Sequence, residues 1–260
     1  MRQYLSTLGV LVLCSAASLL GADNPFAGRW KLDASKSQLA GETFRIESTG
    51  SGMYRMSSYG QSATFALDGK QYPGFFDRKV SFKQSDPNTW DETVTLKDGT
   101  ELVRINYSLS SDGKTLTQTV KGKKPNGDPI DAVTVSERVG AGSGMTGTWK
   151  DKEVKDNNPN ALEFVDKGPD GLGASMPDLK VSWTGKPDGE DIAPTGPTVP
   201  DGLTLAWKKT GDRSMDFVQK MKGQPIFKST YTVSDDGQTL TITGSATSAN
   251  EPTTEVYVRE

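Results

Sequence analysis

Apolar and polar residues alternate with a period of two along most of this chain, and no helical periodicity is visible. Such alternation is typical of β-strands that bury one face. The pattern predicts about eight short strands in each half of the chain. The predicted strands begin near Trp30, Phe44, Ala63, Val80, Val94, Val103, Leu116 and Val133, and near Trp149, Leu162, Leu179, Leu203, Met215, Phe227, Leu240 and Val256.

Turn-forming dipeptides separate these runs, and they predict hairpins in series. Asp-Gly or Asn-Gly occurs at 68–69, 98–99, 112–113, 126–127, 170–171, 188–189, 201–202 and 236–237. These dipeptides tolerate the positive φ angles of tight hairpin turns. Serial hairpins leave exposed edges, which closure into a barrel removes, so we expect antiparallel up-and-down β-barrels. An open sandwich of two sheets is the alternative that the same alternation supports.

The chain contains an internal repeat. Gly28-Arg29-Trp30-Lys31 matches Gly147-Thr148-Trp149-Lys150, and the segments 107–117 and 231–241 are identical at seven of eleven positions. The repeat predicts two tandem units, residues 23–139 and 147–260. The residues between them, 140–146, begin with Gly140-Ala-Gly-Ser-Gly144 and are predicted to form a flexible linker.

The N-terminal residues 1–22 have the features of a secretory signal peptide. Arg2 is followed by the apolar run Leu8 to Leu13, and the segment ends in small residues at Ala22. The apolar run is shorter than the roughly 20 residues that a membrane-spanning helix needs. We therefore expect export to the periplasm, the cell envelope or the extracellular space, with no membrane span after cleavage.

Two residue types that carry much of enzyme chemistry are missing from the predicted mature chain. The sequence has no histidine, and its one cysteine, Cys14, lies in the predicted leader. Thiolate nucleophiles, Ser-His-Asp triads and zinc sites of the Cys/His kind are thereby excluded. Acidic doublets such as Asp91-Glu92 point to opposite faces of a strand, and we expect them to be solvated. No metal and no cofactor is predicted.

The charge of the chain gives no sign of a nucleic-acid partner. There are 30 basic and 33 acidic residues, a formal net charge of −3. Neither half carries the dense basic face that phosphate neutralisation demands. We therefore expect no nucleic acid among its partners.

A tryptophan opens each unit and an arginine closes it. Gly28 and Trp30 precede Arg138, and Gly147 and Trp149 precede Arg259. This arrangement resembles the signature of tandem lipocalin-like (calycin) proteins of the secreted bacterial type. The resemblance implies that Arg138 stacks on Trp30 and Arg259 on Trp149, so that each pair shuts one end of a barrel. The alternative is that the tryptophans are ordinary core residues and the arginines are surface charges.

Aromatic residues near loops are the candidates for ligand contact. Tyr72, Phe75 and Phe76 cluster at a turn in the first unit, and Trp183 and Trp207 flank a long proline-rich segment in the second. Long ordered loops often serve as lids or binding elements. Core packing is the alternative for all five.

The sequence therefore favours an exported, non-enzymatic binding or interaction module. The lipocalin-like resemblance implies a small apolar ligand where a cavity exists. A calycin-like enzyme that uses a carboxylate or a tyrosine in acid–base chemistry is one alternative. A structural cell-envelope protein with filled barrels is the other.

Overall fold

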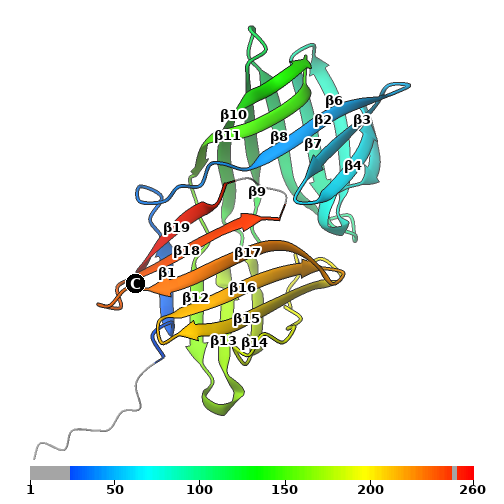
Figure 1. Ribbon diagram of the computed structural model, residues 1–260. Coiled ribbons are helices and arrows are strands. Elements are labelled where there is room, and N and C mark those ends of the chain that lie inside the picture. Colours follow the sequence, from blue (N-terminus) through cyan, green and yellow to red (C-terminus); the bar gives the residue numbers. More distant parts are fainter. Residues whose placement is uncertain (1–23, 248–250) are drawn as a thin grey trace, which may run out of the picture.

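The structure, a computed structural model, describes residues 24–247 and 251–260, and in these ranges the chain folds into antiparallel β-strands (Figure 1). The predicted all-β class is confirmed. The predicted signal peptide, residues 1–22, lies outside the described residues. Among the described residues, no helix has the length and apolar character needed to cross a membrane.

Ten of the described strands form a nearly closed barrel, in the order β4-β3-β2-β11-β10-β9-β8-β7-β6-β5. The terminal strands β4 and β5 are consecutive in the chain and separated by Leu67 alone. The strands are β2 (Thr43–Gly50), β3 (Met53–Ser58), β4 (Gln61–Ala66), β5 (Asp68–Pro73), β6 (Lys79–Asp86), β7 (Thr89–Thr95), β8 (Glu101–Leu109), β9 (Thr115–Lys123), β10 (Pro129–Ser143) and β11 (Thr146–Asp156). A one-turn 3-10 helix, η1 (Phe75–Asp77), joins β5 to β6.

The other nine described strands form a half-barrel, in the order β14-β13-β12-β1-β19-β18-β17-β16-β15. The strands are β1 (Gly28–Leu32), β12 (Leu162–Asp166), β13 (Leu172–Met176), β14 (Val181–Gly185), β15 (Leu203–Gly211), β16 (Ser214–Met221), β17 (Gln224–Val233), β18 (Thr239–Ala246) and β19 (Thr253–Arg259). Two further one-turn 3-10 helices, η2 (Gly168–Asp170) and η3 (Pro177–Leu179), follow β12 and β13.

The second unit differs from the predicted closed barrel because a proline-rich segment lies between its edge strands β14 and β15. This segment, residues 186–202, makes isolated bridges to both edges, Ser182 with Thr195 and Ile192 with Leu205. Its prolines lack the N–H group that a continuous ladder requires. The segment therefore fills the gap without completing the sheet.

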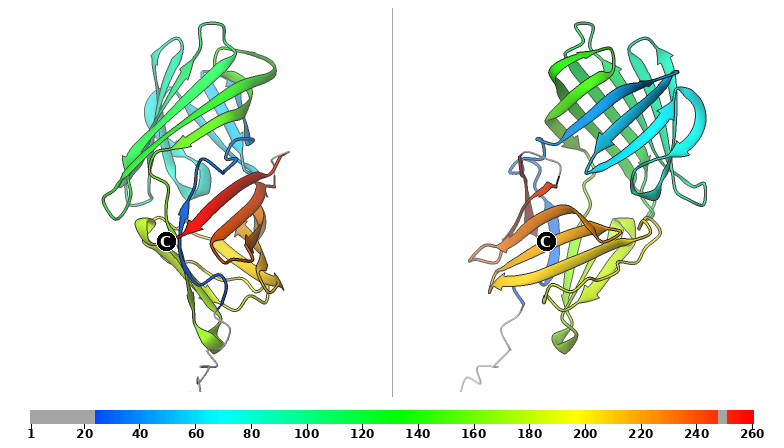
Figure 2. Two further views of the ribbon diagram at one scale, coloured as in Figure 1. Left: turned by 90° about the vertical axis from the view of Figure 1, so that its left-hand side faces the viewer. Right: turned by 45° about the vertical axis from the view of Figure 1, so that its right-hand side comes forward.

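The two sheets exchange their first strands. β11, which starts the second repeat, lies in the barrel between β10 and β2, and β1, which starts the first repeat, lies in the half-barrel between β19 and β12. Figure 2 shows β1 running beside β19, at the opposite end of the chain. The barrel, residues 43–156, is thus inserted between two strands of the half-barrel, and sheet membership does not follow a division at residues 140–146.

The short connection between the repeats explains this exchange. Residues 140–146 are not a flexible linker; they form the tip of the β10–β11 hairpin, in which Ser143 pairs with Thr146. A connection of this length brings two strands together at little cost in chain entropy. β11 therefore takes the place beside β10 that β1 would occupy in a barrel closed within the first repeat.

Both tryptophan–arginine pairs form, with partners opposite to those predicted. The Arg259 guanidinium carbon lies 4.1 Å from the Trp30 ring centroid, and that of Arg138 lies 4.2 Å from the Trp149 ring centroid. Each pair is cross-strand, Trp30 beside Arg259 and Trp149 beside Arg138. The expected pairs, Trp30 with Arg138 and Trp149 with Arg259, are wrong because the first strands are exchanged.

The two tryptophan–arginine pairs make equivalent hydrogen bonds. The Trp30 and Trp149 indoles are fully buried and donate to the carbonyls of Phe26 (2.9 Å) and Met145 (3.0 Å). Arg138 Nε donates to Gly113 O at 2.7 Å, and Arg259 Nε donates to the equivalent Gly237 O at 2.6 Å. At Gly28 and Gly147, which have positive φ, a Cβ would collide with the guanidinium. The Gly-x-Trp motif therefore leaves room for the arginine.

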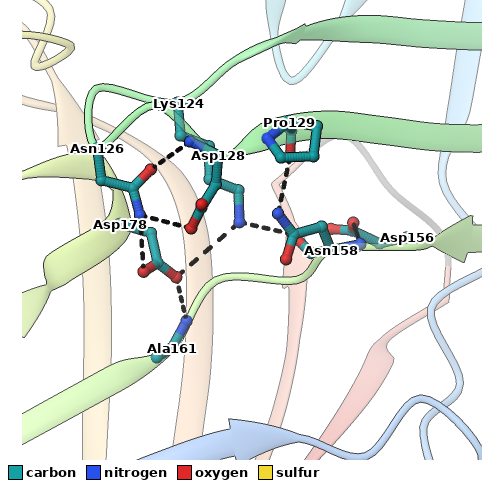
Figure 3. A network of polar contacts seen from close by, with 8 residues as sticks. All are labelled: Lys124, Asn126, Asp128, Pro129, Asp156, Asn158, Ala161 and Asp178. Carbon is teal, nitrogen blue, oxygen red and sulfur yellow. Dashed lines mark hydrogen bonds and ion pairs between the residues drawn. The ribbon is translucent and has the colours of Figure 1, made fainter.

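A polar network joins the two units (Figure 3). Lys124, in the β9–β10 turn of the barrel, donates to Asn158 O at 2.6 Å, and its Nζ lies 3.9 Å from a carboxylate oxygen of Asp178 in η3 of the half-barrel. Asp178 also accepts from Asn126 Nδ2 (3.3 Å) and from the backbone N–H of Ala161 (3.0 Å). The Lys124 side chain is 3% exposed. The network thus fixes a buried charge between the barrel and the half-barrel.

Candidate functional site

The barrel encloses a partly open cavity of about 500 Å³. This volume lies within the range of ligand pockets. Apolar atoms make up the larger share of the cavity surface, and its apolar lining residues are Phe44, Met56, Phe75, Phe76, Val80, Val94, Leu102 and Ile105. The polar lining consists of Glu42, Thr43, Ser58, Tyr59, Arg78, Glu92, Tyr107, Gln118, Thr134 and Asp151.

A buried carboxylate and a buried tyrosine meet in this cavity. Glu92 on β7 is 6% exposed, Tyr107 on β8 is 3% exposed, and the Tyr107 hydroxyl donates to Glu92 Oε2 at 2.6 Å. Burial raises the pKa of Glu92 to about 7, although the hydrogen bond from Tyr107 lowers it in part. Burial, together with the nearby Glu92 charge, raises the pKa of Tyr107 well above its usual range. Glu92 therefore titrates near neutral pH.

Two further carboxylates, from Glu42 and Asp151, line the cavity on the side facing the half-barrel. Burial raises the pKa of both Glu42 and Asp151; a backbone hydrogen bond from Ala246 of the half-barrel opposes the rise at Glu42. Asp151 accepts from the Ser136 hydroxyl at 2.7 Å. Tyr59 lies near both carboxylates, and burial raises its pKa. The cavity thus has two acidic regions.

The rim of the cavity is built from η1 and the residue that follows it. Phe75 and Phe76 are half-buried and line the cavity, and the Phe76 ring lies 6.0 Å from that of Tyr59. Phe76 and Asp77 have φ of 50° and 61°, values that are costly for residues other than glycine. Gln61 Oε1 accepts from the Phe76 backbone N–H at 3.0 Å and holds this conformation.

The rim also contacts the half-barrel. Arg78 Nη2 donates to the carbonyl of Thr198, in the proline-rich segment, at 2.5 Å. Beside it, Lys97 forms ion pairs with Asp77 of the rim and with Asp201 of the same segment. The segment that fills the half-barrel gap therefore also lies against the mouth of the barrel cavity.

The structure separates the five predicted ligand contacts. Phe75 and Phe76 line the cavity. Tyr72 lies on β5, with its hydroxyl donating to Asp68 Oδ2 at 3.0 Å on the exposed surface. Trp183 and Trp207 are 6% and 1% exposed in the half-barrel core, with ring centroids 6.2 Å apart. Trp183 and Trp207 are therefore core residues, which was the alternative to ligand contact.

The half-barrel has apolar residues where the barrel has acids. Tyr231 is the repeat equivalent of Tyr107, and the strand registers place Phe217 at the position of Glu92. Counting from the paired tryptophans, Leu32 stands at the position of Asp151. Phe217 packs against Tyr231, with ring centroids 5.3 Å apart. The half-barrel therefore has no acid at the positions of Glu92 and Asp151; its half-buried carboxylate, Glu255 on β19, lies elsewhere and accepts from the Tyr257 hydroxyl at 2.6 Å.

Sequence reasoning missed Glu92, the most unusual side chain of the cavity. The Asp91-Glu92 doublet was expected to be solvated, but only Asp91 is exposed. A signal was present, because Trp90, Glu92 and Val94 form a period-two run that places Glu92 on the buried face. Among the described residues, no group of three or more acidic side chains lies close enough to hold a metal ion.

Comparison with known proteins adds no family to these observations. No protein-family model matches the chain. No curated protein matches it at the significance used to assign relatives.

Proposed function

We propose that this protein is an exported, lipocalin-like binding module that holds a small, predominantly apolar ligand in the barrel cavity. The observation that carries the proposal is the 500 Å³ cavity with its largely apolar wall. Two buried tryptophan–arginine pairs and the serial antiparallel hairpins support the lipocalin-like assignment. The core cluster of the half-barrel is rich in aromatic side chains, and the half-barrel contributes none of its described residues to the lining of this cavity.

Filling the cavity tests this function. Ile105 on β8 lines the cavity, and its neighbour Arg104 is exposed on the outer face. We expect the neutral fluorescent probe N-phenyl-1-naphthylamine to bind the wild type, and Ile105→Trp to weaken binding by about 10-fold or more because the indole occupies the ligand volume. Arg104→Trp is the matched control and should bind normally. Equal binding by both variants, with intact circular dichroism, would place the probe elsewhere and contradict the proposal.

A second candidate function, acid–base catalysis, is favoured by the Glu92–Tyr107 pair. A carboxyl group whose pKa lies near 7 can act as a general base or acid at neutral pH. The pair lines an open cavity, so a substrate there could reach it. In this alternative Glu92 transfers the proton and Tyr107 orients it.

Metabolite profiling separates catalysis from retention. The purified protein would be incubated at low concentration with a small-molecule extract and followed by mass spectrometry. Catalysis requires that some compound is consumed in large molar excess over the protein, and that Glu92→Gln stops the consumption. Depletion that never exceeds one equivalent per protein chain would reject the enzyme and retain the binding module.

A further inference from the structure

The charges lining the barrel cavity are unbalanced. Three carboxylates face it, from Glu42, Glu92 and Asp151, against the single guanidinium of Arg78. That guanidinium donates through Nη2 to the Thr198 carbonyl of the half-barrel. Among the ion pairs of the described residues, none includes one of the three carboxylates. Arg78 is therefore the one cation in the cavity lining of the described residues, and it forms no ion pair with any of the three carboxylates.

Glu92 is the most deeply buried of the three carboxylates. The residue is 6% exposed, and the Tyr107 hydroxyl is its hydrogen-bond donor in the described structure. An ionised carboxylate has about four acceptor positions, and burying it without an opposite charge is costly. A cation entering from the cavity would supply both the charge and the missing donors. The surrounding wall would at the same time bury an apolar body.

We infer that the ligand of the barrel cavity is an amphipathic amine, whose ammonium group binds at Glu92 and whose apolar body packs against the wall formed by Ile105, Phe44 and Phe75. This inference rests on the proposed binding function and gives its ligand a chemical class. Tyr107 is then a positioning residue, because its hydroxyl holds one Glu92 oxygen and leaves the other for the ligand.

The half-barrel shows that the acid is not a requirement of the architecture. Phe217 occupies the position of Glu92 there and packs into an aromatic core. An apolar residue at position 92 would thus be compatible with this type of sheet. At this position the barrel carries the desolvation cost of a buried acid, which Phe217 avoids in the half-barrel.

The pH dependence of binding follows from the groups that face Glu92. These are Tyr107 on β8, Arg78 after η1 and, across the cavity, Asp151 on β11 and Glu42 before β2. Because burial raises the pKa of Glu92 to about 7, the ionised form that binds an ammonium is lost as the pH falls below 7. An alkylamine, with a pKa near that of lysine at about 10, stays protonated throughout this range.

A matched pair of probes tests the inference. Decylamine and decanol have the same alkyl chain, and each would be titrated against bound N-phenyl-1-naphthylamine in the full-length protein. We expect the wild type at pH 8 to prefer decylamine by about 10-fold or more, and the preference to shrink at pH 6. Glu92→Gln should remove the preference for decylamine over decanol. The neighbouring Asp91→Asn, which neutralises an exposed carboxylate of the same strand, should keep it.

The outcomes distinguish this inference from the function on which it rests. If decanol binds as well as decylamine and Ile105→Trp blocks both, the cavity binds apolar ligands and the amine inference is overturned. It is overturned as well if Glu92→Gln keeps the preference for decylamine. If neither probe displaces the dye, the binding function also fails. The wild-type pH series remains decisive even if Glu92→Gln does not fold.

Discussion

Burial at single residues decides the chemistry of the cavity. Glu92 and Asp91 are adjacent, yet one is 6% exposed inside the barrel and the other lies on the outer face. The pleat of the strand turns successive side chains to opposite faces, and so places two carboxylates in different environments, of which the buried one, Glu92, has a raised pKa. The residue type alone does not show this difference.

The stability of the protein should report the buried Glu92 directly. Its pKa is about 7 in the folded state against an ordinary value of 4.5, so the folded protein binds this proton more tightly than the unfolded chain. This contribution is fully present below pH 4.5 and is lost as the pH rises through 7. We expect Glu92→Gln to match the wild type near pH 4.5 and to be more stable at pH 8, by about 3 kcal/mol at most.

Urea denaturation of the two proteins at pH 4.5, 6 and 8 measures this difference. Asp91→Asn serves as the control, since it removes an exposed carboxylate from the outer face of the same strand. A stability difference between Glu92→Gln and the wild type that stays constant across the three pH values would contradict the assigned environment of Glu92.

The exchanged first strands are the main finding at the level of elements. β1 supplies its tryptophan to the half-barrel and β11 supplies its own to the barrel. Because a buried tryptophan dominates the packing around it, each repeat depends on a strand from the other. Neither sheet is complete within residues 23–139 or 147–260.

Truncating each tryptophan should therefore unfold the unit to which its strand belongs. Trp30→Ala is expected to destabilise the half-barrel by about 3 kcal/mol or more, although Trp30 lies in the first repeat. Trp149→Ala is the matched variant, and it should destabilise the barrel instead. Hydrogen exchange by mass spectrometry would locate the loss of protection in β12–β19 for the first variant and in β2–β10 for the second. The reverse assignment would restore the contiguous units predicted from the repeat.

Most strands were predictable from periodicity, and those that were missed have identifiable reasons. The alternation marked the positions of β2, β4, β6 to β12 and β14 to β19, as well as β1. β13 is Leu-Gly-Ala-Ser-Met, whose small residues give a weak pattern, and β5 is Asp-Gly-Lys-Gln-Tyr-Pro, which is mostly polar. β3 alternates only over Tyr54-Arg55-Met56, because Met53 stands next to Tyr54 and the strand ends in two serines, and Met56 is its one buried residue. Strands β3 and β5, which bury few side chains, therefore show little alternation in the sequence.

At the level of the whole molecule, the two units are joined by two chain crossings and by side-chain contacts. The crossings, residues 33–42 and 157–161, connect strands of different sheets. Lys124 and Asp178 pair across the junction, and Arg78 and Lys97 contact the proline-rich segment near the cavity mouth. The half-barrel thereby forms part of the surroundings of the barrel cavity.

Removing Lys124 or Asp178 at the junction should lower the free energy of unfolding by different amounts. Asp178→Ala leaves the Lys124 ammonium buried with the Asn158 carbonyl as its acceptor, and we expect a loss of about 3 kcal/mol. Lys124→Met leaves Asp178 with donors from Asn126 and Ala161, so the cost should be nearer to about 1 kcal/mol. Chemical denaturation of both variants and of the double variant measures the difference. A larger loss for Lys124→Met would show that Asp178 depends on the lysine instead.

The sequence by itself determined the all-β class, the antiparallel hairpins, the repeat and the four residues that form the tryptophan–arginine pairs. These features depend on local alternation, turn chemistry and residue type, which act over a few neighbouring residues. The partner of each tryptophan, the open second sheet and the position of Glu92 inside a cavity were decided only by the tertiary structure. They depend on which distant strands become neighbours, and here a short hairpin between the repeats made that choice.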